Sequence, residues 1–403
     1  MDVSTFFLKL LILLLSAKFF AEIFARLKLP SVLGEVIAGV ILGPSLLDVV
    51  RPDAVFHLLA EIGILLLLFE VGLETDIGQL TKVGVQSTLV AVTGVILPAF
   101  LGYYFAHHIL GLPFIAALFI GGTLVATSIG ITVRVLADLR RQRTKTAQVV
   151  LGAAVIDDVV GVVILALLYD FVSTGEVSIL KTLKVLMFIS LFMVLAPVVA
   201  RFLSLFIGKL SDTNKTKGML PTLIISLILG MAVLSHEVGA PEILGSFAAG
   251  IALARRFFLP LAAGLEHYSH GLAEKIEVEM KSIIDLFVPI FFVVVGASMD
   301  LRVIDFGSQD FWMAALGLSC VAIAAKMASG VWVKGGWNKK LATGVAMVPR
   351  GEVGLIFAEV GKKAGVLNEV MYAVVVFVVA VTTLVAPLAL RIILRREDGD
   401  STT

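Results

Sequence analysis

The sequence predicts an all-α polytopic membrane protein, and three observations support this fold class. Of the 403 residues, 59% are hydrophobic and only 16% are charged, whereas about 25% of an average soluble domain is charged. The mean hydropathy is +1.03. Apolar runs of about twenty residues, the length that crosses a bilayer as a helix, recur along almost the whole chain. We therefore expect a single transmembrane domain over residues 1–403.

Thirteen transmembrane helices are expected, each an apolar window between charge clusters or Pro and Gly breaks. The first window, "FFLKLLILLLSAKFF", follows Asp2 and no basic residue, which indicates a membrane helix and not a cleaved signal peptide. The expected spans lie near 4–26, 31–50, 54–74, 84–108, 113–139, 146–172, 179–206, 220–237, 242–258, 284–299, 310–333, 341–364 and 369–393.

Lysine and arginine residues gather in alternate connections between the spans, and this bias predicts the orientation. One set includes "RRQRTK" at 140–145 and Lys334, Lys339 and Lys340, while the opposite connections hold few basic residues. Because cytoplasmic loops carry the excess of positive charge, we expect the N-terminus outside the plasma membrane and the C-terminus in the cytoplasm. The single cysteine, Cys320, allows no intrachain disulfide and suggests no metal cluster. No nucleic-acid partner is expected. No cofactor is expected.

The two halves of the chain resemble each other. "PSVLGEVIAGVIL" at 30–42 matches "PEILGSFAAGIAL" at 241–253, and "FEVGLETD" at 69–76 matches "VVVGASMD" at 293–300. Seven spans separate the matched segments, so the two copies point in opposite directions, as the inverted repeats of many secondary transporters do. We expect repeat 1 over about 4–172, a linker helix over 179–206 and repeat 2 over 220–393.

Each copy contains a segment suited to a break in its helix. "GTLVATSIGIT" at 122–132 offers Thr127 and Ser128, and "AMVPRGEVGL" at 346–355 contains Pro349, which lacks a backbone donor. Unwound helix ends leave carbonyls that can bind a cation and dipoles that need a compensating charge. The sequence therefore predicts a binding site at a pair of interrupted helices. Around the second break, Arg350 and Glu352 are expected to neutralise helix dipoles and to steady the break.

Two adjacent carboxylates, Asp157 and Asp158, lie at the middle of the sixth expected span. An ionised residue at the centre of a membrane helix costs about 2.5–3.5 kcal/mol, and the matching positions of the second copy are Val381 and Thr382, so the fold does not demand acids there. Lys326 in the eleventh span is the natural partner of one acid. A buried salt bridge without a transport role is the plainer alternative.

A cation and a proton would compete for the second carboxylate. Neighbouring residues on a helix point about 100° apart, so one Asp can face Lys326 while the other faces an aqueous cavity. A monovalent cation favours the ionised acid and expels its proton, and protonation expels the cation. This competition is sufficient for antiport if the site can face either side. If the lysine also carries a proton, two protons move for one cation and transport is electrogenic.

Five segments resemble the monovalent cation:proton antiporters, on the branch that holds NapA-type sodium/proton antiporters and Kef-type potassium systems. They are "GAAVIDDVVG", "LVATSIGIT", "LLLLFEVGLET", "LGEVIAGVILGPSLL" and "MVPRGEVGLI". The resemblance implies an NhaA/NapA-like fold with crossed interrupted helices, a homodimer in the lipid bilayer, and elevator-type exchange of Na+ or Li+ for protons. The ion-carrying core would comprise 54–172 and 284–393, and the scaffold and dimer helices 4–50 and 179–258.

The resemblance also assigns roles to residues. Asp158 would be the principal carboxylate for the cation and the proton, and Asp157 would pair with Lys326. Thr127 and Ser128 would line the site, so that the transported Na+ would meet these two side chains and both acids. Departing from the pattern of its relatives, Glu70 offers a further proton or cation contact.

Three other functions are compatible with parts of the sequence. A K+/H+ antiporter or a Kef-like K+ efflux protein would use the same oxygen ligands, because size selectivity depends on distances. A symporter of organic anions would need a further polar cluster, which the sequence does not offer. An intramembrane aspartyl protease would need a second membrane Asp in a GxGD setting beside Tyr169 and Asp170, and that motif is absent. A transporter and not an enzyme is therefore expected.

Overall fold

The described residues of the computed structural model form helices joined by short connections, without strands. They comprise residues 2–75, 77–174, parts of 183–200, 218–254, 269–305 and 307–400. Helices suit a bilayer because each backbone donor and acceptor is satisfied within its own segment. The helices are α1 (Val3–Arg26), α2 (Ser31–Leu42), α3 (Ala54–Glu74), α4 (Ile77–Tyr104), α5 (Phe114–Thr123), α6 (Ile129–Asp138), α7 (Lys145–Thr174), α9 (Met219–Glu237), α10 (Glu242–Leu253), α11 (Ser269–Ser298), α12 (Gln309–Ala328), α13 (Trp337–Ala346), α14 (Glu352–Lys363) and α15 (Glu369–Asp400).

Short helical turns of other types follow three of these helices. A π-helical turn, η1 (Phe105–Ile109), follows α4, and 3₁₀ turns follow α11 and α12 as η3 (Leu301–Val303) and η4 (Ser329–Trp332). Seven described helices are long and apolar enough to cross a membrane: α3, α4, α7, α9, α11, α12 and α15. This bears out a multi-pass helical membrane protein. The full number of thirteen spans and the inverted repeat stay predictions, and half of the expected linker helix lies outside the described residues.

Two expected spans have different ends in the structure. α2 ends at Leu42 and not near residue 50, because Gly43 and Pro44 begin a loop in which Asp48 adopts a positive φ of 52°. α11 begins at Ser269, well before the expected 284, because a charged helical segment continues the apolar one. An apolar window detects only the part of a helix that meets lipid.

Two expected spans are interrupted where the sequence predicts. The first is split into α5 and α6 by residues 124–128, and the second into α13 and α14 by residues 347–351. Pro349 cannot donate a backbone hydrogen bond, and Gly351 has a non-helical backbone with φ of −142° and ψ of −139° just before α14. Both breaks are buried.

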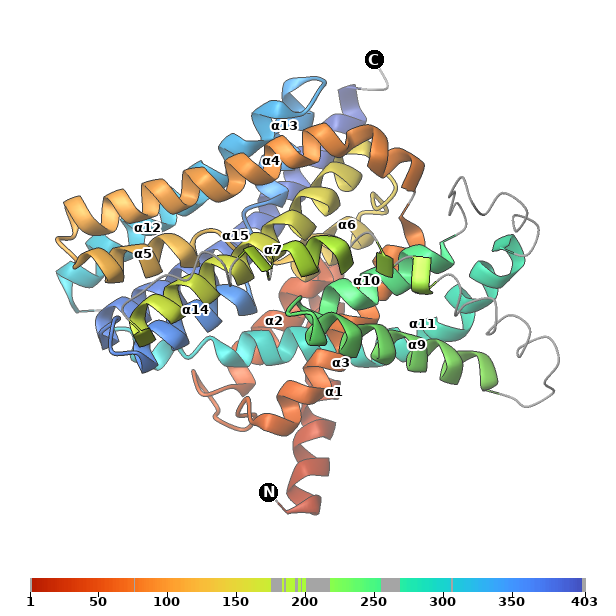
Figure 1. Cartoon of the computed structure of the whole chain (residues 1–403). Helices are drawn as coiled ribbons and strands as arrows, with labels where there is room; N and C mark the ends of the chain where they lie inside the picture. Colours follow the sequence, from red (N-terminus) through yellow and green to blue (C-terminus); the bar gives the residue numbers. More distant parts are fainter. Residues whose placement is uncertain are drawn as a thin grey trace. The chain divides into compact units, whose positions relative to one another are not determined.

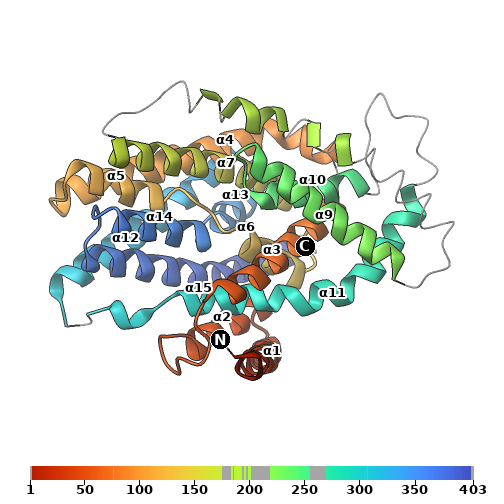
Figure 2. The same cartoon turned by 60° about the horizontal axis from the view of Figure 1, so that its bottom comes forward.

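The chain divides into two compact units. Unit 1 comprises Met1–Phe56, Gly84–Ser178 and Phe292–Thr403, and unit 2 comprises His57–Val83 and Ile179–Phe291. In unit 1, α5, α6 and α7 run alongside α13, α14 and α15, as the yellow and blue ribbons of Figures 1 and 2 show. These units reflect packing alone, and the functional division into core and scaffold stays a prediction.

Within unit 2, α9 packs on α10, and α10 crosses α3 at two glycines. A Cβ on Gly72 would lie 2.3 Å from the carbonyl oxygen of Phe247, and one on Gly250 would lie 2.2 Å from that of Phe69. Real Cβ contacts are never this close, so the crossing requires glycine at both positions. The hydroxyl of Ser246 donates to the carbonyl of Leu65 beside it.

Within unit 1, a polar cluster joins the start of α2 to α6. The Asp138 carboxylate accepts the backbone N–H of Ser31 at 2.8 Å and its hydroxyl at 2.7 Å, which caps the start of α2. One turn earlier on α6, Arg134 lies 3.7 Å from the fully buried carboxylate of Glu35. The two helices are therefore held together by charge as well as by packing.

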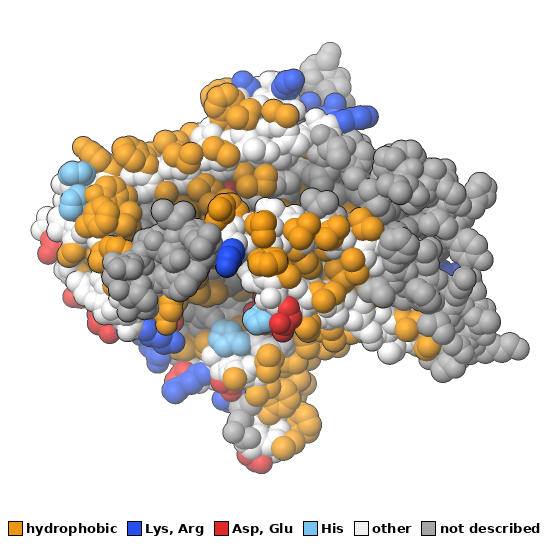
Figure 3. Space-filling view, in the orientation of Figure 1, with side chains coloured by type: hydrophobic (Ala, Val, Ile, Leu, Met, Phe, Trp, Pro, Cys, Tyr) orange, Lys and Arg blue, Asp and Glu red, His pale blue; other side chains and the backbone are white. Residues whose placement is uncertain are grey.

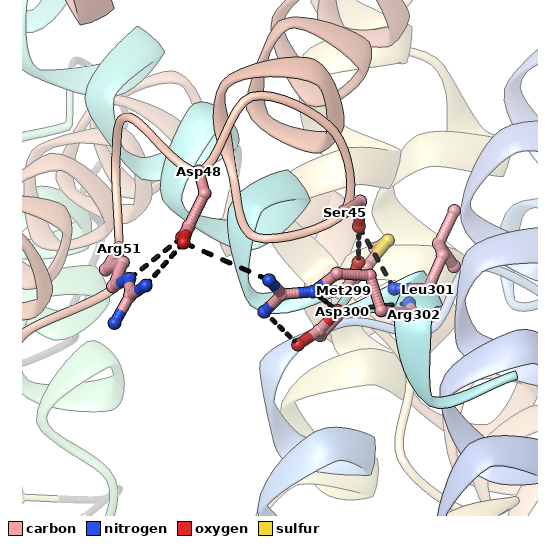
Figure 4. A network of polar contacts seen from close by, with 7 residues as sticks. All are labelled: Ser45, Asp48, Arg51, Met299, Asp300, Leu301 and Arg302. Atoms are coloured by element: carbon pink, nitrogen blue, oxygen red, sulfur yellow. Dashed lines mark hydrogen bonds and ion pairs between the residues drawn. The ribbon is translucent and has the colours of Figure 1, made fainter.

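A second polar cluster, drawn in Figure 4, joins the loop after α2 to the end of α11. The Ser45 hydroxyl donates to the carbonyl of Met299 at 2.7 Å. Asp48 accepts the Nε–H of Arg51 at 2.8 Å and lies 3.9 Å from a guanidinium nitrogen of Arg302. Both ends of α2 are thus fixed by side chains.

Candidate functional site

A buried ion pair lies at the centre of unit 1. The ammonium of Lys326 on α12 donates to Oδ2 of Asp157 on α7 over 2.5 Å, and both residues are 0% exposed. The lysine packs against α4, where a Cβ on Gly94 would be in ordinary contact with Nζ of Lys326 at 3.4 Å. Since a buried charge is costly unless it is paired, each member needs the other.

The first helix break contacts the same carboxylate. The Thr127 hydroxyl donates to Oδ2 of Asp157 at 2.8 Å and lies 3.3 Å from the carbonyl of Met347 in the other break. The Asp157 oxygen therefore receives hydrogen bonds from an ammonium and a hydroxyl. Its second oxygen, Oδ1, is buried and has no hydrogen-bond partner among the described residues.

The two breaks touch each other directly. The backbone N–H of Ser128 donates to the carbonyl of Pro349 at 2.8 Å, and the Thr132 hydroxyl donates to the carbonyl of Ala346 at 2.7 Å. A Cβ on Gly351 would lie 2.7 Å from the Ser128 hydroxyl oxygen, so glycine is required for this approach. That hydroxyl is buried and has no hydrogen-bond partner among the described residues.

Arg350 is fully buried beside the breaks and donates to two main-chain carbonyls. Nη1 lies 3.0 Å from the oxygen of Ala126, in the first break, and Nη2 lies 3.3 Å from that of Ala322 on α12. Its own carbonyl accepts the Thr383 hydroxyl of α15. These contacts supply donors to carbonyls around the break, and the role of Arg350 in neutralising helix dipoles stays a prediction. The side chain of Glu352 lies outside the described residues.

Asp158 follows Asp157 on α7 and is 4% exposed. Because consecutive helical side chains differ by about 100° in direction, its carboxylate leaves the helix in a different direction from that of Asp157. Unit 1 contains every predicted site residue except Glu70, which belongs to unit 2. An extra role for Glu70 stays a prediction.

Three contributors to the site were not predicted from the sequence. Thr132 and Thr383 donate to main-chain carbonyls of distant segments, and Gly94 lies against the lysine ammonium. In the sequence, each looks like any small residue of a membrane helix. The paired threonines Thr382 and Thr383 in an otherwise apolar span were the one available signal.

The arrangement provides oxygen atoms suited to an alkali cation. Carboxylate, hydroxyl and carbonyl oxygens converge where α7 passes the two breaks, and such oxygens can replace water around Na+ or K+. Among the described residues, no group of three or more His, Cys, Asp and Glu side chains could hold a metal ion. A site of this kind would bind a single transported cation through few ligands.

Comparison with known proteins gives a consistent result. The family described as "Sodium/hydrogen exchanger, transmembrane" matches residues 10–396. A high-affinity Na(+)/H(+) antiporter, NhaS3 of Synechocystis sp., is 35% identical, with 95% of this chain and 88% of the relative covered. The Na(+)/H(+)-K(+) antiporter GerN of Bacillus cereus is 32% identical, with 95% and 94% covered.

The fold has a solved counterpart. The sodium proton antiporter MjNhaP1 of Methanocaldococcus jannaschii superposes with a TM-score of 0.68 at 16% sequence identity, over 96% of this chain and 95% of the other. At this identity the likeness concerns the fold alone.

Proposed function

Because this chain belongs to the sodium/hydrogen exchanger family and is a membrane cation:proton antiporter, we propose that it exchanges Na+, and also Li+, for protons at Asp158. The observation that carries this proposal is the meeting of two helix breaks beside the buried pair of Asp157 and Lys326. The pair engages Asp157, and the adjacent acid on the same helix is proposed to bind the transported ion.

The exchange at Asp158 follows from competition. The ionised carboxylate attracts a monovalent cation, and protonation removes the charge that holds it. Hydroxyl and carbonyl oxygens of the breaks, among them the Ser128 hydroxyl, complete the ligands of Na+. A carrier that moves only when it holds either the cation or the proton couples the gradient of the cation to that of the proton.

The second proton comes from Lys326. In the proton-loaded state Asp158 is neutral, and the lysine ammonium pairs with Asp157. When Na+ binds between the two acids, Lys326 gives up its ammonium proton and moves away from Asp157 as a neutral amine. Because Asp158 also gives up its proton, two protons are released for one cation. The loaded forms differ by one charge, and transport of 2H+ for 1Na+ is electrogenic.

Alternating access is proposed to follow an elevator mechanism in a homodimer. The core helices would carry the site, while α2 and the other scaffold helices stay fixed in the bilayer. The contact between Ser31 on α2 and Asp138 on α6 joins the proposed scaffold to the proposed core. It must therefore open when the core moves. The N-terminus would face the outside of the plasma membrane and the C-terminus the cytoplasm.

Collapse of a pH gradient in proteoliposomes tests this function. Addition of Na+ or Li+ should dissipate the gradient, and valinomycin with K+ on both sides, which clamps the membrane potential, should accelerate an electrogenic exchange. Asp158→Asn should abolish the response, and Asp157→Asn should nearly abolish it. Normal exchange by Asp158→Asn would refute the assigned carrier.

The second candidate is a K+/H+ antiporter or a Kef-like K+ efflux protein. It is favoured by the relative GerN, whose name includes K(+). The same proteoliposomes distinguish the two candidates when K+ replaces Na+ without valinomycin. A response to K+ that equals the response to Na+ would favour this candidate.

A further inference from the structure

Two tryptophans are exposed where α12 turns into α13. The turn consists of residues 329–340, here called the interface hairpin. Within it Trp337 is 73% exposed and Trp332 is 46% exposed, and Val331 beside them is 53% exposed. These side chains present an apolar and aromatic surface at the end of a membrane helix.

Three lysines accompany the tryptophans. Lys334 and Lys339 are exposed and Lys340 is half-buried, and none of them has an ion pair within the part of the chain that the structure describes. Figure 3 shows basic side chains beside hydrophobic ones along the upper edge of the view, where α13 lies in Figure 1. The hairpin therefore carries an unneutralised positive charge next to its aromatic surface.

The hairpin is held rigidly against α4. The indole N–H of Trp332 donates to the Thr93 hydroxyl at 2.7 Å, and the backbone N–H of Lys334 donates to the Gln86 side-chain oxygen at 2.9 Å. Its two arms touch backbone to backbone, because a Cβ on Gly330 would lie 2.0 Å from the carbonyl oxygen of Lys340. The exposed side chains thus project from a fixed frame.

This frame is continuous with the ion site. The Ser329 hydroxyl donates to the carbonyl of Lys326 at 2.6 Å, and α13 leads directly into the break that begins at Met347. Gly94, one residue after Thr93 on α4, faces the lysine ammonium. A ligand bound to the interface hairpin can therefore act on Lys326 through the hydrogen bond from Ser329, and on the second break through α13.

We propose that the interface hairpin binds an anionic phospholipid headgroup and that this contact regulates exchange. Tryptophan is enriched at the membrane–water interface, where its ring meets the acyl boundary and its N–H a polar group. Lysines near that boundary attract anionic headgroups. The lipid phosphate is held by Lys334, Lys339 and Lys340 while Trp337 anchors the hairpin at the depth of the headgroups. A free anion would not use the exposed indole.

Lipid binding to the purified full-length protein tests the proposal without any transport assay. Retention of phosphatidylglycerol and of phosphatidylcholine with the same acyl chains is measured by native mass spectrometry. The parent should retain phosphatidylglycerol preferentially. Each lysine near an anionic surface is worth about fivefold in affinity, so K334Q/K339Q/K340Q should lose about a hundredfold. Equal retention of phosphatidylglycerol by this variant would overturn the site.

Two controls identify what the hairpin recognises. Lys362→Gln with Lys363→Gln removes two lysines that already pair with Glu369 and Glu359, and this variant should retain the lipid like the parent. Trp337→Ala should weaken retention with the lysines intact, and an unchanged affinity would contradict the role of the indole. Displacement of the lipid by millimolar inorganic phosphate would show a free-anion site and contradict a bilayer contact.

Exchange in vesicles then tests regulation. Parent protein should exchange faster in vesicles that contain phosphatidylglycerol than in vesicles of phosphatidylcholine alone. K334Q/K339Q/K340Q should respond equally in both, while its exchange in phosphatidylcholine matches the parent. The same lipid dependence in this variant as in the parent would contradict the regulation of exchange by lipid binding at the hairpin. Loss of exchange by the parent in every lipid would instead count against the proposed function.

Discussion

The ammonium of Lys326 and the carboxylate of Asp157 lie 2.5 Å apart, and neither residue has any exposed surface. Removing one member of a buried pair leaves an uncompensated charge, which costs about 3–5 kcal/mol. Lys326→Ala should therefore lower the melting temperature of the purified protein. It should also shift the stoichiometry toward electroneutral exchange, because one proton carrier is lost.

The shift in stoichiometry is measured by the response of the exchange rate to a membrane potential clamped with valinomycin. The double variant Asp157→Asn with Lys326→Ala is the matched control for the melting temperature. It removes both charges and should recover part of the lost stability. A Lys326→Ala protein that keeps the full response to membrane potential would remove the lysine from the proton count.

Gly351 sets the distance between the two breaks. A methyl group there would lie 2.7 Å from the Ser128 hydroxyl oxygen, and overpacking of this kind costs about 1–3 kcal/mol. If that cost falls on cation binding, Gly351→Ala should raise the half-saturating Na+ concentration by about five- to 150-fold. Initial rates of exchange at a series of Na+ concentrations give this half-saturating concentration. Gly230→Ala in α9, where a Cβ meets nothing within 4 Å, is the control.

Unchanged half-saturation in Gly351→Ala would contradict the close crossing of the breaks as a feature of the cation site. A comparable rise in Gly230→Ala would show that the effect is not local.

The helix breaks and the ion pair could be predicted because each follows from a local physical cost. Pro349 cannot complete a helix, and an acid in the middle of an apolar span needs a base, for which Lys326 was the candidate within the membrane. Which acid faces the lysine could not be derived from spacing, since neighbouring residues differ only in direction around the helix. The family resemblance supplied that assignment.

Other parts of the site depend on tertiary contacts. The hydrogen bonds from Thr132 and Thr383 reach carbonyls more than thirty residues away, and a threonine in a helix more often bonds within its own turn. The position of Gly94 beside Lys326 depends on the packing of α4 against α12. Helix ends such as Leu42 and Ser269 depend on contacts and charges that an apolar window does not register.

Relative motion of α2 and α6 can be tested by a reversible cross-link. In a Cys320→Ala background, Ser31→Cys with Asp138→Cys places two thiols where a side chain and a backbone N–H are now 2.8 Å apart. Oxidation should stop exchange and reduction should restore it, because the elevator requires this contact to open. The counterflow of Na+ before and after reduction is the measurement.

The matched control links two positions inside the proposed scaffold. His236→Cys with Glu242→Cys replaces a contact of 2.7 Å, and its oxidation should leave exchange unaffected. Full exchange by the oxidised Ser31 and Asp138 pair would contradict a fixed α2 and a moving α6.

The loop after α2 should respond to acid. The hydrogen bond from Arg51 holds the pKa of Asp48 below its ordinary value, with the charge of Arg302 adding to the effect. A lowered pKa stabilises the fold above the unfolded pKa of about 3.9, and this contribution is lost as the pH falls below it. Asp48→Asn should therefore melt earlier than the parent by a constant interval from pH 7 to about pH 5.

That interval should shrink below about pH 4, as the parent loses the contribution that the variant lacks. Melting temperatures of both proteins across this range are the measurement. An interval that is the same at pH 3 as at pH 7 would show that the Asp48 carboxylate does not stabilise the loop.

Direct binding of Na+ at several pH values tests the central claim, because it asks whether a proton and the cation share Asp158. Isothermal titration of the detergent-solubilised protein should give an apparent Kd that rises by up to about a hundredfold per pH unit as the pH falls below the titration of the site, because two protons leave for each Na+ bound. Asp158→Asn should bind no Na+. An affinity for Na+ that is independent of pH, or that survives in Asp158→Asn, would contradict exchange by competition at this carboxylate.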